Sequence, residues 1–266
     1  MGYSISVILK SLFRNLLFII VQNSIYHLLL QRVSQHQKSW AMLIDPDKTT
    51  LQQLFTIIEY AQKYPPTLFF VGSSLLMHPE NLNLLVQELK KHLNIPIILF
   101  PGSYHHLSVS ADAVLFLSLI SGRNPDFLIG NHLLAAPLLK KMHLEVIPTG
   151  YMLIDGGRIT SVAYISNTQP LPNDKTDLAV CTAMAGELLG MKLIYLEAGS
   201  GALTPVPAAM IRAVKENIQV PLIVGGGIRT STDFQAALQA GADVIVTGNV
   251  LEKNLDLMKE FYQLIA

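Results

Sequence analysis

Carboxylates and a hydroxyl follow short apolar runs at three points of this chain. Asp45 comes directly after one such run, with Asp47 two residues on, and Ser74 comes shortly after the next. Mg²⁺ takes one or two carboxylates and completes its shell with water and substrate phosphates. The plainer alternative for Asp or Ser at such a position is a helix cap. Glu197 follows a third run and precedes a glycine turn. A carboxylate there is costly unless it is paired or solvated, so Glu197 is a candidate for proton transfer.

Two glycine signatures mark the last third of the chain. The first is Gly225-Gly226-Gly227 and the second is Gly248-Asn249, and each ends a β-branched run and opens a helical segment. Glycine lets backbone N–H groups come close to an anion, and the following helix N-terminus adds partial positive charge. Two such strand ends side by side are typical of the phosphate site of a (β/α)8 barrel. The sequence therefore predicts that the protein binds a phosphorylated small molecule.

Eight apolar runs alternate with helical patterns from residue 25 onward. The runs are nearly unbroken, as expected of parallel strands covered by helices. Strands are expected at residues 41–44, 68–71, 96–100, 113–117, 145–147, 193–196, 222–224 and 244–246, and residues 148–151 are expected in the loop after the fifth strand. Helices are expected at residues 51–64, 79–93, 126–141, 177–189, 207–217 and 232–240. The pattern predicts a (β/α)8 TIM barrel, with one helix missing or irregular after the third strand because residues 103–112 are short and polar.

The composition is that of one enzyme-sized domain. The chain has 266 residues, of which 50% are hydrophobic and 14% charged. Lys+Arg and Asp+Glu balance at 19 each, which argues against a nucleic-acid partner held by a basic face. The one cysteine, Cys181, is expected to be a small buried residue of a reduced, cytoplasmic protein. The histidines show no metal-ligand spacing and are expected on the surface or in loops. Few charges on so apolar a chain indicate helices covered by another subunit, so a homo-oligomer is expected.

The first 24 residues form an apolar, cationic extension to a single domain over residues 25–266. Residues 4–21 are apolar but interrupted by Lys10 and Arg14, and the uninterrupted run that follows Arg14 is too short to span a bilayer. No small-residue cleavage site of a signal peptide follows. Two readings stay open: a cationic amphipathic helix on a membrane surface, or a start codon assigned too far upstream.

A set of loop motifs carries a family resemblance. The motifs are Leu43-Ile44-Asp45-Pro46-Asp47-Lys48, Val71-Gly72-Ser73-Ser74, Ser121-Gly122-Arg123-Asn124-Pro125, Tyr195-Leu196-Glu197-Ala198-Gly199-Ser200-Gly201, Val224-Gly225-Gly226-Gly227-Ile228 and Gly248-Asn249. Together they resemble the geranylgeranylglyceryl phosphate synthase family, which includes bacterial heptaprenylglyceryl phosphate synthases of the PcrB type. Single motifs are weak, because Gly-Gly-Gly-Ile occurs in many phosphate-binding barrels, but the set is specific. The motifs around Arg123 and Glu197 resemble the larger, second group of the family.

The resemblance implies a Mg²⁺-dependent prenyltransferase. Such an enzyme joins sn-glycerol 1-phosphate to a polyprenyl diphosphate through an ether bond and releases diphosphate. The second-group motifs favour the geranylgeranyl donor, and a longer donor such as heptaprenyl diphosphate is the alternative. By the same resemblance, Asp45 and Ser74 are metal ligands, Glu197 and Tyr195 are catalytic, and Arg123 contacts the diphosphate. The glycerol 1-phosphate site would comprise Tyr195, Leu196, Glu197, Ala198, Gly199, Ser200, Gly201, Gly226, Gly227, Gly248 and Asn249.

Two positions depart from the family pattern. Leu43 stands where the heptaprenyl enzymes carry a lysine, so that phosphate contact is absent or supplied elsewhere. Ser73 stands where the family usually has glycine, which puts a small side chain into a tight turn. Since prenyl substrates live in membranes, a cytoplasmic protein with peripheral membrane contact is expected.

Two other functions compete with this one. A different phosphate-binding barrel enzyme, such as an isomerase or aldolase, would need a catalytic lysine or a carboxylate pair, and Lys48 is the only lysine near a predicted strand end. A lipid-binding relative without activity would keep an apolar groove but need neither Asp45 nor Glu197. Turnover assays with Mg²⁺, glycerol 1-phosphate and a panel of prenyl diphosphates separate the three.

Overall fold

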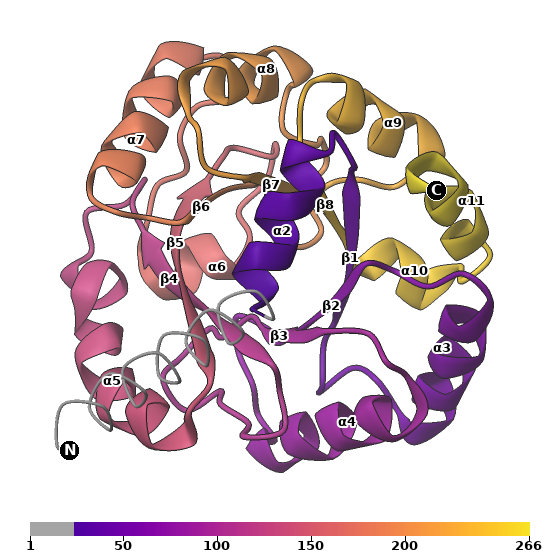
Figure 1. Cartoon of the computed structure of the whole chain (residues 1–266). Coiled ribbons are helices and arrows are strands. Elements are labelled where there is room, and N and C mark those ends of the chain that lie inside the picture. The colour runs from indigo at the N-terminus through magenta and orange to yellow at the C-terminus, as the bar shows by residue number, and fades with distance from the viewer. Residues whose placement is uncertain (1–23) are drawn as a thin grey trace, which may run out of the picture.

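Nearly unbroken apolar runs form eight parallel strands that close into a barrel. The computed structural model describes residues 24–266, and each strand pairs with its neighbour in the chain, with β8 returning to β1 (Figure 1). The strands are β1 (Ser39–Ile44), β2 (Leu68–Val71), β3 (Ile97–Leu99), β4 (Ala113–Leu119), β5 (Glu145–Leu153), β6 (Leu193–Glu197), β7 (Leu222–Gly225) and β8 (Val244–Thr247). The predicted (β/α)8 fold is confirmed.

Helices surround the barrel in Figure 1 and begin where the sequence supplies start signals. Thr50 and Thr230 each form a capping box, and Pro79 occupies a first-turn position that tolerates its missing N–H. The helices that follow the strands are α3 (Leu51–Lys63), α4 (Pro79–His92), η1 (Asp126–Gly130), α5 (Asn131–Met142), α6 (Ser161–Ser166), α7 (Thr176–Leu188), α8 (Ala208–Asn217), α9 (Ser231–Gln239), α10 (Asn249–Lys253) and α11 (Leu257–Ile265). The helix predicted at residues 126–141 therefore begins as one π-helical turn, η1.

No helix separates β3 from β4, as the sequence predicts. The chain passes from Leu99 to Ala113 through a segment of turns and bends. The outer face of β4 is therefore covered by α5 on one side and by this irregular segment on the other. A space between them becomes part of the site described below.

The prediction for the fifth strand is wrong at its carboxyl end. Residues 148–151 continue β5, which runs to Leu153, and they pair with β4 and β6. Pro148 and Gly150 look like loop residues in the sequence, but Gly150 serves packing. A Cβ on it would lie 2.8 Å from Ile120 and 3.0 Å from Ile194. The loop after this strand therefore begins at Ile154.

A helix before the first strand, α2 (Ile25–Ser34), lies across the barrel in Figure 1. Its first backbone N–H groups, those of Ile25 and Tyr26, donate to the Glu145 carboxylate at 2.6 and 3.0 Å. Glu145 begins β5, so α2 covers the amino ends of the strands and leaves the carboxyl ends open. Ser24 caps α2 by accepting from the N–H of His27. The rest of the extension predicted over residues 1–24 lies outside the described residues.

Two single-residue predictions, those for Cys181 and His132, also need correction. Cys181 is exposed on α7 and not buried. His106 lies in the loop between β3 and β4 but is buried, and His132 is buried on α5. The Nε2 atom of His132 lies 3.2 Å from the Ser118 hydroxyl, which itself donates to the carbonyl of Leu128. His132 therefore packs between α5 and β4.

Candidate functional site

A wide cavity of about 660 Å³ opens at the carboxyl ends of the strands, the end where barrel enzymes carry their chemistry. Loops after six of the eight strands line it, those after β3 and β4 excepted apart from Phe100. Its position puts both glycine signatures and the predicted carboxylates into one space. The predicted residues that line it are Asp45, Ser74, Glu197, Gly199, Ser200, Gly201, Gly226, Gly227, Gly248 and Asn249.

Glu197 is a buried carboxylate at the end of β6. Its side chain is 6% exposed, and Oε1 accepts a hydrogen bond of 2.7 Å from the N–H of Gly199. Burial raises the pKa of Glu197, and hydrogen bonds from Tyr195 and from Gly199 oppose that rise. A carboxylate with a raised pKa that faces a cavity suits proton transfer.

Tyr195 lies beside Glu197, inside the barrel. Burial, and next the charge of Glu197, hold the pKa of Tyr195 well above its usual value, so its hydroxyl stays protonated. The Glu197 carboxylate is close enough to this buried hydroxyl to interact with it, but the two groups do not meet at normal hydrogen-bond geometry. Its ring stacks on Phe100 and meets Tyr151 edge-on, so the aromatic contacts fix its position. A buried hydroxyl with a poorly aligned partner is costly, so Tyr195 keeps its place through ring packing and acts on the site through Glu197.

The glycines at the end of β7 make room for that carboxylate. A Cβ on Gly226 would lie 2.4 Å from Oε1 of Glu197, and one on Gly225 would lie 2.6 Å from the Tyr195 hydroxyl. Gly226 and Gly227 also have φ of +79° and +72°, a region that favours glycine. The Gly225-Gly226-Gly227 signature therefore leaves room for the Glu197 and Tyr195 side chains as well as opening the backbone toward the cavity.

Asp45, at the end of β1, faces the cavity as half of an ion pair. Its Oδ2 lies 2.8 Å from Nζ of Lys48, and its Oδ1 accepts from the N–H of Asp47. Partial burial lowers the pKa of Lys48, but the hydrogen bond and the charge of Asp45 outweigh it and raise that pKa above its usual value. Asp47 has a different task, because its carboxylate accepts from the N–H groups of Met77 and His78 in the loop after β2. Ser73 donates to the carbonyl of Leu75 in that loop.

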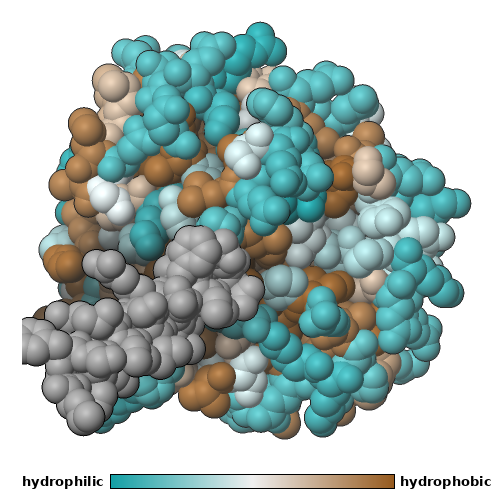
Figure 2. Space-filling model, in the orientation of Figure 1, coloured by the Kyte–Doolittle hydropathy of each residue, from teal (hydrophilic) through white to brown (hydrophobic). Residues whose placement is uncertain are grey.

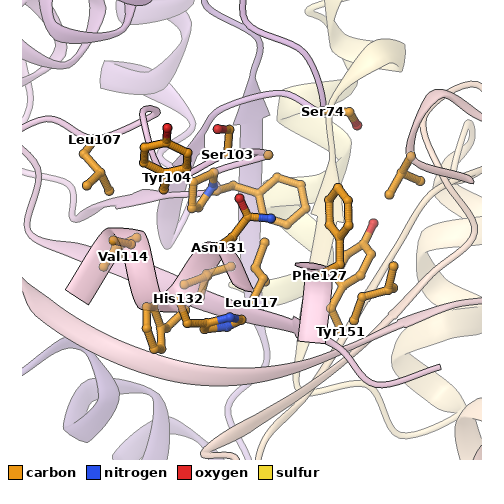
Figure 3. Close-up of a pocket in the computed structure, with 18 of the residues that line it drawn as sticks. Ser74, Ser103, Tyr104, Leu107, Val114, Leu117, Phe127, Asn131, His132 and Tyr151 are labelled. Carbon is orange, nitrogen blue, oxygen red and sulfur yellow. The ribbon is translucent and has the colours of Figure 1, made fainter. Parts of the chain in front are cut away.

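A narrow pocket of about 100 Å³ leads away from the wide cavity into the space beside β4. Figure 3 shows its side chains converging from the loops after β2 and β3, from β4 and from α5. Phe116, Ala135 and Leu139 line it, and although Asn131, His132 and three serines also contribute, most of its wall is apolar. The rise of α5 puts Asn131 and Leu139, both in the wall, about 12 Å apart. The pocket and the cavity share Ser73, Ser74, Phe100, Tyr151 and Val162.

The narrow apolar pocket joins the wide, charged cavity, and the buried Glu197 carboxylate faces that cavity. A prenyl donor and a phosphorylated acceptor would need such an arrangement. The sequence match agrees: the model of the PcrB family matches residues 32–264. The chain belongs to the PcrB family.

Relatives of this PcrB-family chain carry one enzyme name. A geranylgeranylglyceryl phosphate synthase of Spirosoma linguale is 52% identical over 227 residues, which cover 84% of this chain and 90% of that protein. One of Chitinophaga pinensis is 48% identical over 240 residues, which cover 90% and 95%. The crystal structure of (S)-3-O-geranylgeranylglyceryl phosphate synthase from Thermoplasma acidophilum, in complex with substrate sn-glycerol-1-phosphate, matches with a TM-score of 0.86 and 31% identity, covering 91% of this chain and 98% of that one. The predicted family is confirmed, and with it the prediction of an enzyme.

The sequence interpretation of this PcrB-family chain missed several cations of the cavity. Arg158, Arg229 and Lys253 line it together with Lys48, which the sequence already places near a strand end. Arg158 and Arg229 donate to the carbonyls of Gly201 and Ala202, and so brace the loop after β6. Arg158 lies beyond the loop predicted at residues 148–151, because β5 runs six residues further than the predicted fifth strand. These cations share the cavity with Leu43, the position at which the resemblance to the heptaprenyl enzymes would lead one to expect a lysine.

Four predicted site residues do not line the wide cavity: Tyr195, which is fully buried inside the barrel, and Leu196, Ala198 and Arg123. Leu196 and Ala198 are buried among the residues that pack the barrel against its helices. Arg123 is in a separate hollow formed with residues 167–172, where its guanidinium donates to the carbonyl of Gly122. Its proposed diphosphate contact stays a prediction that the position of this hollow does not favour. The Ser200 and Asn249 side chains, by contrast, hydrogen-bond to each other at 3.0 Å across the cavity rim.

Proposed function

We propose that this chain joins sn-glycerol 1-phosphate to geranylgeranyl diphosphate, forming 3-O-geranylgeranylglyceryl 1-phosphate and diphosphate. One observation carries the proposal: the narrow apolar pocket and the wide cavity meet at a shared wall of Ser73, Ser74, Phe100, Tyr151 and Val162. The reacting carbon of a prenyl diphosphate is the junction between an apolar tail and a charged head. A site with that same junction suits such a donor.

The acceptor would occupy the part of the cavity nearest β6 to β8. Gly226, Gly227, Gly248 and the Ser200–Asn249 pair offer backbone and side-chain donors to its phosphate. The choice of sn-glycerol 1-phosphate as acceptor is supported by the Thermoplasma acidophilum relative, whose structure was solved in complex with it. The acceptor hydroxyl would then face Glu197 and Tyr195.

In the proposed step, the acceptor hydroxyl oxygen forms a bond to the first carbon of the donor while the bond from that carbon to diphosphate breaks. The hydroxyl proton passes to the carboxylate of Glu197, and diphosphate leaves. Tyr195 stays protonated and interacts with the Glu197 carboxylate, which it helps to position. Lys48 stays charged next to the leaving group.

We also propose Mg²⁺ as the cofactor, held by Asp45 with Ser74. The described residues contain no group of three His, Cys, Asp or Glu side chains that could hold a metal alone. One carboxylate and one hydroxyl fit a cation that takes its other ligands from substrate phosphates and water. When bound, the ion would neutralise charge on the departing diphosphate.

The direct test is turnover by the purified chain with Mg²⁺, radiolabelled sn-glycerol 1-phosphate and geranyl, farnesyl, geranylgeranyl and heptaprenyl diphosphates. The highest kcat/KM is expected with the geranylgeranyl donor. An ether product with every donor except this one would contradict the donor assignment, and no product with any donor would contradict the reaction.

Filling the narrow pocket should discriminate between donors by length. Ala135 is buried in its wall, so Ala135→Phe should shorten the space and raise the KM for geranylgeranyl diphosphate at least about tenfold, since each buried methylene is worth roughly 0.8 kcal/mol. Geranyl diphosphate should lose much less. Leu138→Phe is the matched control, because Leu138 is exposed on the same helix. Equal losses for both donors would mean that the tail lies elsewhere.

Gly248→Ala should weaken the acceptor and spare the donor. A Cβ there would lie 3.3 Å from the carbonyl oxygen of Leu43, so the backbone would shift slightly without unfolding. Gly227 is a poorer probe, because its Cβ would collide with Thr204. The KM for glycerol 1-phosphate should rise about tenfold, the value of one hydrogen bond to a charged group. An equal rise in the donor KM would show that Gly248 serves packing only.

A homo-oligomer is also proposed. Large apolar side chains are exposed on α7, among them Leu178 and Leu188, and Figure 2 shows brown atoms along the edge where α7 lies in Figure 1. Exposed apolar patches of this kind mark contact surfaces. Light scattering should give a multiple of the 29.3 kDa chain mass, and Leu188→Glu should lower it. A monomer at micromolar concentration would contradict the proposal.

A further inference from the structure

Large apolar side chains stand exposed on two segments that also line the cavity or the pocket, the one that carries α6 and the loop after β2. Ile159 and Tyr164, on the segment that carries α6, are 80% and 82% exposed. Leu75 and Met77, in the loop after β2, are 61% and 68% exposed. We call these four residues the apolar rim. Single exposed apolar side chains are ordinary, but these four gather at the catalytic end of the barrel.

The rim is continuous with the inside of the site. Leu75 and Met77 line the wide cavity. On α6, Ile165 is 39% exposed and also lines the narrow pocket, while Val162 lines both spaces. An apolar path therefore runs from solvent, over the rim, to the pocket wall. An opening of this kind suits a ligand that arrives from an apolar phase.

We propose that the apolar rim docks the open end of the barrel on a lipid surface, from which the donor tail enters the narrow pocket. This inference rests on the proposed function, because only a substrate with a long apolar tail needs such an entry. The chemistry of the rim fits an interface: a tyrosine suits the boundary between headgroups and acyl chains. The exposed cation Arg158 lines the same cavity and would face lipid phosphates.

None of the helices in the described part of the chain is long and apolar enough to cross a membrane. The proposed docking is therefore a peripheral contact. The four rim side chains would enter only the outer part of the bilayer, as interfacial segments do. A bilayer also accounts for apolar side chains on two facing loops better than a protein partner does, because a protein seated there would close the cavity to glycerol 1-phosphate.

The test is co-sedimentation of the full chain with phosphatidylcholine vesicles, with and without phosphatidylglycerol. Ile159→Ser should lower the partition coefficient about tenfold, and Ile159→Ser with Tyr164→Ser should lower it further, because each apolar side chain is worth more than 1.4 kcal/mol when buried. Leu84→Ser is the matched control: Leu84 is 53% exposed on α4, away from the rim, and its loss should leave binding unchanged.

Two outcomes would overturn the proposal. One is that the double variant binds vesicles as well as the unchanged chain does. Binding that disappears only when residues 1–23 are removed would count as the same outcome. The other is loss of self-association, and not of vesicle binding, when the rim is changed. Turnover with geranyl diphosphate in vesicle-free buffer keeps the proposed function separate: rim variants should retain it, and its absence in the unchanged chain would instead overturn the reaction.

Discussion

Replacing Glu197 with glutamine is expected to lower kcat by about 10²- to 10⁴-fold, the usual contribution of a general base. The amide keeps the shape of the side chain and can still accept the hydrogen bond from Gly199, but it cannot take a proton. Because the base acts only when the hydroxyl attacks, the loss should fall on kcat more than on the KM for glycerol 1-phosphate.

Glu187→Gln gives the matched control for this change. Glu187 lies on α7 and accepts from the N–H groups of Gln219 and Val220, outside the cavity, so its variant should turn over normally. Calorimetric titration of glycerol 1-phosphate into Glu197→Gln then separates binding from chemistry. If affinity collapses while the rate at saturation is retained, Glu197 binds the acceptor and is not the base.

The raised pKa of Glu197 gives this residue a signature in pH profiles. Burial favours the protonated form, whereas the base must be ionised. Activity should therefore fall, as pH is lowered, at a higher pH than the usual glutamate value of about 4.3. The stability effect has the opposite sign: the folded state binds this proton more tightly than the unfolded state does, so the stability it contributes is present at low pH and is lost as pH rises through the folded pKa. At neutral pH, Glu197→Gln should unfold no more easily than the unchanged chain.

Strand positions could be predicted because parallel strands buried on both faces leave an unbroken apolar run. The end of β5 could not, because its residues look like loop. Gly150 is a packing glycine, and its role depends on Ile120 and Ile194, which reach it from neighbouring elements. The π-helical turn η1 could not be predicted either. It differs from an α-helical turn in its i→i+5 hydrogen bonds, and it lies within one continuous helical pattern of the sequence.

The candidate site shows the same division. Residues directly after a strand, such as Asp45 and Glu197, were found from local sequence because topology brings all strand ends to one face. The cations Arg158 and Arg229 were not found, since their place in the cavity depends on loop paths. The motif around Arg123 looked like diphosphate chemistry, yet Asn124 uses its amide to donate to the carbonyl of Ser166 on α6. That contact ties the loop after β4 to α6 and has no signature in the sequence.

Asp45→Asn is expected to reduce turnover by orders of magnitude with the barrel intact. The variant removes the carboxylate that comes directly after β1, and with it both the proposed Mg²⁺ ligand and the partner of Lys48. The acceptor site lies on the other side of the cavity, so glycerol 1-phosphate should still bind. Mn²⁺ titration in the presence of geranylgeranyl diphosphate, followed by electron paramagnetic resonance, should show weaker metal binding in this variant.

Asp47→Asn separates metal binding from loop structure. Asp47 is two residues away and also lines the cavity, but its carboxylate is committed to the N–H groups of Met77 and His78. Its variant should lower Tm while keeping Mn²⁺ affinity, whereas Asp45→Asn should do the reverse. Normal turnover in Asp45→Asn would remove that residue from the mechanism. Lost turnover with unchanged Mn²⁺ affinity would instead assign Asp45 to holding Lys48 against the diphosphate, since an ion pair of 2.8 Å fixes the position of that ammonium.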